Sequence, residues 1–485
     1  MYIKILLLIN LLSIINICFI NRKNKTLIFK IALLWSCINL IWISLILFII
    51  KFNYHFQFQF IINFSRSNHL NLSWGNIIFS IDGISSLLIY LSIILTIICI
   101  IISFNTINFL FKEFLIFLNL NLILLILVFS IFDLLIFYIF FESILIPIFL
   151  MIGIWGSRNT KIKAAFYFFF FTLIGSLIML IGLFKIYQLF GTTNLESLIS
   201  ISLPCSIQYL LFISFFLSFS VKIPMIPFHI WLPQAHVEAP VAGSVLLAGI
   251  LLKLGGYGFI RFFFPLFPNA ILFFSPFIII LSCIAIIYGA LSTCRQSDIK
   301  RLIAYSSVSH MGFVVISIFN YSIEGLISSI IIMIAHGLSS SGLFIGSSIL
   351  YWRFHSRIIK YNKGLAYSMP IFSSIIFILI LGNISFPLTI NFIGEFISIL
   401  SASRYSLFIG ILMSIGAFIG IIYSFLLFNK IFFGSHSKNL YLPRDLIFIE
   451  FSSFIPLILG LILLGIFPNI LINLTIFPSL IFISF

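Results

Sequence analysis

Six titratable side chains stand deep within runs of sequence that are otherwise apolar. They are two glutamates, two lysines and two histidines: Glu142, Lys222, Lys253, His310, His336 and Glu395. Inserting a lysine at the centre of a membrane helix costs roughly 2.5 to 3.5 kcal/mol, so such residues usually face a protein interior or water and mark an ion pathway. Because a nearby carboxylate changes the proton affinity of a buried lysine, a pair such as Glu142 and Lys222 has the chemistry of a proton switch. The six residues together predict a chain of proton-binding sites.

Small or polar residues flank four of these groups at helical spacing. On the 3.6-residue period, the clusters that share a helix face are Gly249, Lys253 and Gly256; Ser306 and His310; His336, Ser339 and Ser340; and Asn391, Glu395 and Ser398. Gly and Ser at this spacing also let membrane helices pack closely, and a single buried charge can belong to a structural ion pair. Beside a charge, we interpret the small residues as room for water.

The composition indicates a protein that crosses a membrane many times. Of its 485 residues, 62% are hydrophobic and 8% are charged, against a charged share of roughly 25% in soluble domains. The apolar runs are continuous, whereas strands of a membrane β-barrel alternate polar and apolar residues. A span needs roughly 20 apolar residues, which predicts an all-α fold with about fourteen spans: 3–20, 27–50, 78–104, 114–131, 133–152, 164–190, 207–231, 240–262, 270–291, 301–320, 325–350, 369–400, 404–430 and 450–476.

The basic residues alternate between successive loops, which are numbered here by the span that precedes them. The formal net charge is +15, a value that would suggest nucleic-acid binding in a soluble protein. Eighteen of the 26 Lys and Arg residues belong to odd-numbered loops: Arg22, Lys23, Lys25, Lys30, Lys112, Arg158, Lys161, Lys163, Arg295, Lys300, Arg301, Arg353, Arg357, Lys360, Lys363, Lys430, Lys438 and Arg444. Six others belong to the opposite side: Lys4, Lys51, Arg66, Lys185, Arg261 and Arg404. The positive-inside rule then places the odd-numbered loops on the cytoplasmic or equivalent side, and both termini on the other.

Two of the predicted spans carry their own interruption. Pro224 and Pro227 follow Lys222 directly, in "VKIPMIPFHIW", and Pro387 lies in "GNISFPLTINF" ahead of Glu395. Proline removes a backbone donor and breaks a helix, and free carbonyls at membrane depth are tolerated only in a cavity or within protein. Interrupted helices at matching places indicate an inverted-repeat transporter. Because spans seven and twelve are five apart, we expect two inverted five-helix repeats, spans four to eight and nine to thirteen.

The N-terminal run and the cysteines bear on processing and redox chemistry. The N-terminal apolar run lacks a small-residue cleavage site and is followed by "NRKNK", so we interpret it as the first span. The six cysteines are scattered without C-x-x-C or zinc spacing, which argues against a disulfide framework or an iron–sulfur site. We therefore expect no cofactor or metal in this chain.

The stretch from Lys222 to Phe262, together with "DIKRLIAYSSVSHMGFV" and "AHGLSSSGLF", resembles the NADH dehydrogenase subunit 4 family, the antiporter-like membrane subunits of respiratory complex I. The specific match runs from Phe132 to Phe433, and the rest resembles the family only in hydropathy. The related subunits 2 and 5 have a lysine where this chain has Glu395, and subunit 5 adds a long C-terminal helix. Both points favour subunit 4.

The resemblance implies a domain organisation and roles for the six residues. Helices one to three would occupy 1–112, the repeats 113–265 and 266–434, and the last helix and tail 435–485. Glu142 would pair with Lys222 at the broken helix and Lys253 would be the central relay. His310 and His336 would connect it to Glu395, which ends the path. Gln234 departs from the charged residue of many relatives, and a role for the nearby His229, His236 and Glu238 stays open.

The resemblance also implies an assembly and a location. The chain would be a proton-translocating subunit of an NADH:ubiquinone oxidoreductase of the mitochondrial inner membrane, with both termini in the intermembrane space. Its partners would be other membrane-arm subunits, with subunits 2 and 5 on either side, and lipids, but not nucleic acid. NADH, FMN, iron–sulfur clusters and ubiquinone would be held elsewhere in the complex. Two alternatives stay open: a stand-alone multi-subunit cation/proton antiporter, and a mainly structural subunit in which the buried charges are dispensable.

Overall fold

The structure, a computed structural model, describes residues 2–52, 58–63, 78–201, 203–435 and 443–484. Arg66 and Lys438, two of the residues used to sort the loops by charge, lie outside this part of the chain. The fold divides into two compact units. Unit 1 comprises 1–222, 254–274 and 473–485, and unit 2 comprises 223–253 and 275–472.

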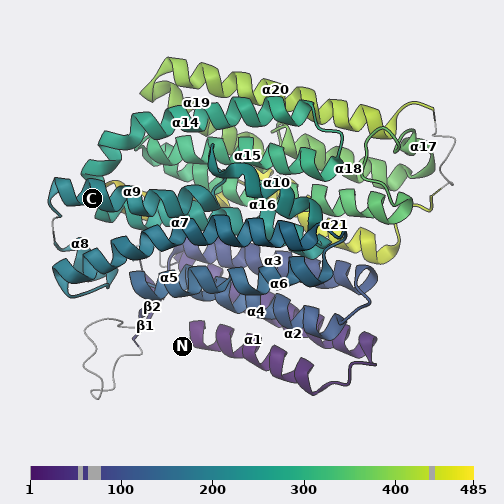
Figure 1. The fold of residues 1–485 in the computed structure, drawn as a ribbon, viewed down its shortest axis with the longest axis horizontal. Helices are drawn as coiled ribbons and strands as arrows, with labels where there is room; N and C mark the ends of the chain where they lie inside the picture. The colour runs from purple at the N-terminus through teal and green to yellow at the C-terminus, as the bar shows by residue number, and fades with distance from the viewer. Residues whose placement is uncertain (1, 53–57, 64–77, 202, 436–442, 485) are drawn as a thin grey trace. The chain divides into compact units, whose positions relative to one another are not determined.

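Unit 1 is a helical bundle with a small two-stranded sheet. Its elements are α1 (Tyr2–Phe19), α2 (Lys25–Phe52), β1 (Gln59–Asn63), β2 (Ile78–Ile81), α3 (Gly83–Thr106), α4 (Phe111–Ser130), α5 (Leu134–Ser143), α6 (Leu145–Trp155), α7 (Lys161–Phe190), α8 (Leu195–Ile199), α9 (Cys205–Lys222), the π-helix η3 (Phe259–Phe263) and α13 (Phe264–Leu266). Helices α1 and α3 each pack on α2 and α4, as Figure 1 shows, and α7 packs on α9. The strands β1 and β2 pair antiparallel.

Unit 2 contains the second half of the first broken helix and the long helices that follow. Its elements are the 3₁₀-helix η1 (Phe228–Ile230), α10 (Trp231–Glu238), α11 (Val241–Leu246), the π-helix η2 (Leu247–Leu251), α15 (Ile299–Phe319), α16 (Ile323–Phe354), α17 (Leu365–Ser368), α18 (Pro370–Asn383), α19 (Ile390–Tyr405), α20 (Leu407–Phe432) and α21 (Phe448–Ile466). Helices α12 (Leu252–Gly258), α14 (Pro268–Cys294) and α22 (Asn469–Ser484) contribute residues to both units. Helix α16 packs against α15 and α19, and it is almost completely buried.

The observed spans confirm the all-α membrane fold. Among the described residues, thirteen helical segments are long and apolar enough to cross a membrane. The predicted span 369–400 is divided between α18 and α19, with a non-helical break at 384–389. This break and the end of α9 at Lys222 lie where the prolines predicted them. The two inverted repeats and their boundaries at 112, 265 and 434 stay predictions.

Two predicted spans differ from the helices observed. The span at 450–476 was wrong, because α21 ends at Ile466 and a separate helix, α22, begins at Asn469. Pro468 explains the difference, since proline cannot donate a hydrogen bond and disfavours helix in the residue before it. The span at 133–152 is not one regular helix, because α5 ends at Ser143 and α6 begins at Leu145. Pro147 lies just after this second interruption.

A glycine lets the end of α21 approach the break between α18 and α19. A Cβ atom added to Gly465 would collide with the backbone of Leu388 and Thr389. Because the collision is with backbone rather than with a flexible side chain, a larger residue would push the break away from α21. Gly465 therefore helps to fix the interrupted span ahead of Glu395.

Contacts within unit 1 join loops that the charge pattern assigns to the same side. Lys112 of loop 3 donates hydrogen bonds to Cys18 O and Ile20 O, at 2.6 and 2.9 Å, at the start of loop 1. Trp155, at the start of loop 5, donates to Phe109 O in loop 3 at 2.8 Å. Isolated β-bridges pair Phe79 with Ile131 and Asp133 with Asn194, at span ends that border the even-numbered loops 2, 4 and 6. These contacts join odd loops with odd loops and even-loop regions with even-loop regions, and the side on which each lies stays a prediction.

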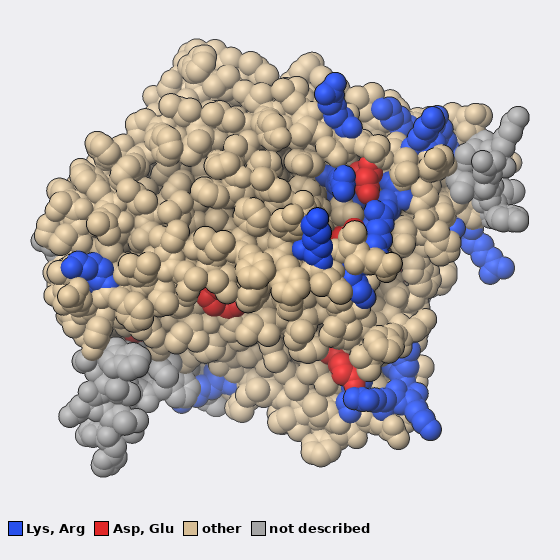
Figure 2. All heavy atoms as spheres, in the orientation of Figure 1, with Lys and Arg blue, Asp and Glu red and all other residues tan. Residues whose placement is uncertain are grey.

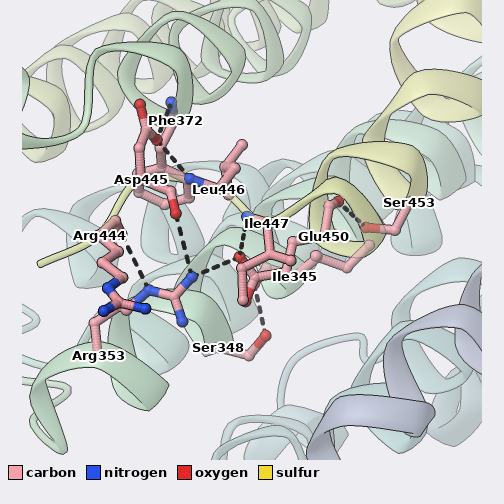
Figure 3. A network of polar contacts seen from close by, with 10 residues as sticks. All are labelled: Ile345, Ser348, Arg353, Phe372, Arg444, Asp445, Leu446, Ile447, Glu450 and Ser453. Atoms are coloured by element: carbon pink, nitrogen blue, oxygen red, sulfur yellow. Dashed lines mark hydrogen bonds and ion pairs between the residues drawn. The ribbon is translucent and has the colours of Figure 1, made fainter.

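The odd-numbered loops of unit 2 also meet one another. A β-bridge pairs Asp298 with Ile358, which joins loops 9 and 11. Loop 13 joins them through Asp445, whose carboxylate accepts hydrogen bonds from two backbone N–H groups at the start of α18. The donors are Ile371 and Phe372, of which Figure 3 shows the second. Lys and Arg side chains lie around the end of unit 2 that carries α17 (Figure 2). An exposed ion pair joins Arg404 and Glu324, which border the even-numbered loops 12 and 10.

The polar contacts drawn in Figure 3 include a largely buried ion pair between α16 and α21. Arg353 Nη2 lies 2.7 Å from Glu450 Oε2, and the two side chains are 13% and 10% exposed. Arg353 Nε also donates to Arg444 O (Figure 3). Helix α16 is thereby tied to the chain segment that enters α21.

Replacing Glu450 by alanine is expected to destabilise unit 2. The change leaves Arg353 without its buried partner, and breaking such a pair costs about 3 to 5 kcal/mol. The measurement is the thermal denaturation of this chain within the purified complex. Glu324→Ala is the matched control, because its ion pair with Arg404 is exposed and such pairs contribute about 0 to 1 kcal/mol. Equal denaturation temperatures for the two variants would contradict this role of Glu450.

Candidate functional site: a buried chain of proton-binding groups

Lys222 is the last residue of α9 and is buried in unit 1. Its side chain is 4% exposed, and Nζ donates a 2.9 Å hydrogen bond to Phe141 O. The ammonium also lies 3.5 Å from the centre of the Phe141 ring, which favours the charged form by a cation–π interaction. The lysine is therefore held by α5, the helix that carries Glu142.

Glu142 lies near Lys222 without contacting it directly. The carboxylate of Glu142 interacts electrostatically with Lys222 and with the hydroxyl of Ser176. Among the described contacts, no direct ion pair joins Glu142 and Lys222. The Oε1 atom of Glu142 is buried and has no hydrogen-bond partner among the described residues. Such unpaired buried oxygens are uncommon. The pair is thus arranged as a carboxylate and an ammonium held a short distance apart by the ends of two helices.

The helix break after Lys222 contains both prolines, and it continues in unit 2. Residues 223–227 are non-helical, Pro224 is buried and Pro227 is exposed. The Ile226–Pro227 peptide bond is cis. Helix resumes with η1 and α10, whose last carbonyl groups accept hydrogen bonds from two buried cations: Arg357 Nη1 donates to Val237 O, and Lys300 Nζ to Ala239 O.

Lys253 is completely buried in unit 2, just after the π-helix η2. Its Nζ contacts Ala248 O within that π-helix, and lies 2.9 Å from Nδ1 of His336. Short π-helical turns are frequent at functional sites. Because Gly249 lies inside η2, the 3.6-residue period that predicted it beside Lys253 does not apply there.

The histidines extend this contact to Glu395. The rings of His336 and His310 lie 5.5 Å apart, centre to centre, and His310 Nδ1 lies 3.0 Å from Glu395 Oε1. Three of these side chains lie on the facing helices α15, α16 and α19, and all four are buried: Lys253 is 0%, His336 1%, His310 7% and Glu395 6% exposed. Four of the six predicted residues therefore lie in a row within unit 2, as two contacting pairs, Lys253 with His336 and His310 with Glu395, whose imidazole rings are 5.5 Å apart.

This series can carry a proton, because each member both gives and accepts one. A protonated lysine donates to an imidazole nitrogen, and a protonated imidazole donates to a carboxylate. The series Lys253, His336, His310 and Glu395 thus has the chemistry of a proton relay.

Polar side chains of the break in span twelve lie close to the relay. Asn391 donates hydrogen bonds to Gly382 O, near the end of α18, and to the hydroxyl of Ser339 at 3.4 Å. Asn391 is buried, whereas Pro387 lies exposed in the turn between α18 and α19. Asn391 therefore provides a hydrogen-bond donor to a backbone carbonyl at the end of α18, next to the helix break in which Pro387 lies.

The sequence interpretation missed two features of the site. The first is the interruption between α5 and α6 beside Glu142. The sequence indicates it through Pro147, which lies five residues after that glutamate. Tyr423 of α20 is 2% exposed and interacts with Ser309 and Glu395. A lone tyrosine in an apolar span gives no comparable signal.

The three residues whose role stayed open cluster around α10. His229, His236 and Glu238 are 8%, 0% and 6% exposed. The ring of His236 stacks on Phe344 with 4.6 Å between centres, and neither of its nitrogens has a hydrogen-bond partner among the described residues. No group of three or more His, Cys, Asp or Glu residues suited to a metal ion lies in the described part of the chain.

Comparisons with known proteins show the family to which the chain belongs. The family model described as NADH:quinone oxidoreductase/Mrp antiporter, TM, matches residues 131–420, a range that includes the six titratable residues singled out in the sequence. NADH-ubiquinone oxidoreductase chain 4 of Metridium senile is 49% identical, over 97% of this chain and 96% of its own length. The protein of the same name from Chondrus crispus is 47% identical, over 96% and 94%.

Solved structures show the same fold. A chain of respiratory complex I from Thermus thermophilus with bound NADH superposes with a TM-score of 0.88, at 26% identity and 99% coverage of both chains. A chain of the Mrp complex from Dietzia sp. DQ12-45-1b gives a TM-score of 0.87 at 16% identity, covering 98% of this chain and 96% of its own, a likeness of fold alone. With close relatives of one name along nearly its whole length, the chain belongs to the NADH-ubiquinone oxidoreductase chain 4 family.

Proposed function

We propose that this chain is a proton-translocating membrane subunit of mitochondrial NADH:ubiquinone oxidoreductase, respiratory complex I. The observation that carries the proposal is the buried series Lys253, His336, His310 and Glu395 in a member of the chain 4 family. A purely structural subunit would not need this series, because burying several charged side chains costs more free energy than packing apolar ones.

Glu142 and Lys222 form the proposed loading site of this pump. The carboxylate stabilises the ammonium when the two approach and releases it when they separate, so the distance between them sets the proton affinity of Lys222. The helix ends at Lys222 and at Ser143 give this pair freedom to move. In this proposal, the carbonyl groups that the prolines of the break leave without helical partners line the route by which a proton reaches the lysine.

The redox chemistry belongs to other subunits of the proposed assembly. NADH, FMN, iron–sulfur clusters and ubiquinone would bind there, and quinone reduction would drive the pump. Subunits 2 and 5 of the complex are the proposed neighbours. Exposed phenylalanines, such as Phe166, Phe170 and Phe184 on α7, suit contact with lipid or with such neighbours.

The proposed orientation places the odd-numbered loops in the mitochondrial matrix and both termini in the intermembrane space. It rests on the positive-inside rule and on the contacts that group the odd loops within each unit. The membrane is the mitochondrial inner membrane, which the chain crosses many times.

A native gel of gently solubilised membranes tests the assembly. We expect this chain, identified by mass spectrometry, in the band that stains for NADH dehydrogenase activity. Its recovery only in small assemblies without that activity would favour the second candidate, a cation/proton antiporter. The observation behind that candidate is the likeness of fold to a chain of the Mrp complex. Sodium-dependent transport by vesicles that lack NADH dehydrogenase would support that candidate directly.

A further inference from the structure

An open hollow of about 300 Å³ follows one face of α7 within unit 1. A volume of this size lies at the small end of the range for ligand clefts, roughly 300 to 1,000 Å³. The residues that line it share one helix face, at positions i, i+3, i+4, i+7, i+8 and i+11: Lys163, Phe166, Tyr167, Phe170, Phe171 and Ile174. All are aromatic or aliphatic except the lysine at one end. We call this hollow the α7 groove.

Two rows of side chains, each with a spacing of four residues, form the walls of the α7 groove. One row contains Lys163, Tyr167 and Phe171, and the other contains Phe166, Phe170 and Ile174. The rings of Phe166 and Phe170 stack with 5.7 Å between their centres. Lys163 Nζ lies 5.9 Å from the centre of the Tyr167 ring. The walls are therefore mainly aromatic, and an ammonium group lies at the head of the groove.

The length of the α7 groove matches one leaflet of a membrane. Ile174 follows Lys163 by eleven positions, which is about 16 Å along an α-helix, and half of a hydrocarbon core is about 15 Å. Phe166, Phe170 and Ile174 are 43%, 53% and 60% exposed in this chain, so the groove is open towards whatever lies beside α7. An extended acyl chain of a phospholipid fits it from end to end, with the headgroup at Lys163.

The basic residues at the head of the groove have no acidic partner among the described residues. Arg158 and Lys163 are exposed, and neither belongs to an ion pair in the described part of the chain. Lys161, between them, donates a 2.7 Å hydrogen bond to a backbone carbonyl of α6. Trp155 ends α6 at the same loop, and tryptophan is enriched at the depth of lipid headgroups. This end of α7 thus has the charge and the depth that suit a phosphate headgroup.

We propose that the α7 groove binds one acyl chain of an anionic phospholipid, whose phosphate group is held by Lys163 and Arg158. The aromatic walls take up the apolar chain, and each basic residue at the membrane surface adds attraction for an anionic lipid. A lipid without net charge gains little from the two cations. A helix of a neighbouring subunit fits less well, because it crosses both leaflets whereas the hollow follows only one.

Photolabelling of the intact purified complex tests the site. The complex, depleted of lipid in mild detergent, is incubated with phosphatidylglycerol that carries a diazirine on one acyl chain, and separately with phosphatidylcholine that carries the same group. After irradiation, mass spectrometry locates the labelled residues. We expect label on α7 between Phe166 and Ile174. Phosphatidylglycerol should label at least about fivefold more than phosphatidylcholine, since one basic residue contributes about fivefold in affinity for an anionic lipid.

Two variants test the head and the walls of the groove separately. Lys163→Gln removes a headgroup contact, and it is expected to lower the phosphatidylglycerol label about fivefold without changing the phosphatidylcholine label. Lys185→Gln is the matched control, because Lys185 is exposed near the other end of the same helix, and it should label as the parent does. Ile174→Trp fills the far end of the groove, and it should reduce the label from both lipids.

Two results would overturn the proposal. Equal labelling by the two lipids, unaffected by Lys163→Gln, would show a lipid contact without selectivity for charge. No label on α7 in the intact complex would show that a neighbouring subunit covers the groove. Because labelling requires no turnover, either result leaves the proposed proton relay untouched, and a failure of the relay leaves the lipid site untouched.

Discussion

Replacing Lys253 by alanine abolishes proton pumping through this chain, while the complex still assembles. The side chain joins the π-helical turn η2 to His336, and alanine neither holds a proton nor reaches the imidazole. Positioned acid–base groups contribute on the order of 10² to 10⁴ in rate, so coupled turnover should fall at least about 10²-fold. The measurement is NADH:ubiquinone oxidoreduction by well-coupled membranes, alongside a native gel for assembly.

A matched control separates loss of the relay from loss of a lysine. Lys185→Ala removes an exposed lysine from α7 and should leave turnover unchanged. Because Lys253 and His336 act in series, the double variant with His336→Ala should be no worse than either single variant. Additive losses in the double variant would show that the two residues act independently, contrary to the relay.

The second large effect is expected for Glu142→Ala. Without the carboxylate, Lys222 keeps its contacts with the carbonyl and ring of Phe141 but loses the charge that regulates its proton affinity. Loading then fails, and pumping should be abolished as it is for Lys253→Ala. Glu142→Gln, which keeps the shape and removes the charge, should show the same loss if the charge is what matters.

Glu196→Gln provides the comparison for Glu142. Glu196 is exposed in α8, so its loss should not affect pumping. Activity retained by Glu142→Gln and lost only by Glu142→Ala would assign the residue a packing role, and it would remove the loading site from the mechanism.

The overall fold was largely predictable because hydropathy and proline carry strong local signals. Runs of about 20 apolar residues give spans directly, and the prolines after Lys222 and within "NISFPL" predicted both breaks. The prediction was wrong at the span 450–476, where Pro468 was overlooked and α21 ends early. The span 133–152 is present, but Pro147 accompanies a short interruption within it beside Glu142.

The site was predictable as a set of residues, but its contacts were not. A charged residue in an apolar run is visible in sequence, yet nothing local shows that Lys253 reaches His336 across 83 positions, or His310 reaches Glu395 across 85. The π-helix η2 changes the register beside Lys253, and no simple period predicts it. Asp82 and Arg261 form a buried ion pair, 2.9 Å long, in unit 1. They are 179 positions apart in the chain, so only the fold shows them as a pair.

The number of protons moved per electron tests the central claim most directly. It is measured in liposomes that contain the purified complex, for the parent and for the Lys253→Ala and Glu142→Ala variants, at equal amounts of assembled enzyme. The account predicts a lower ratio, or no coupled turnover at all, in both variants. An unchanged ratio with normal turnover in either one would contradict it, and would leave this chain a structural part of the membrane.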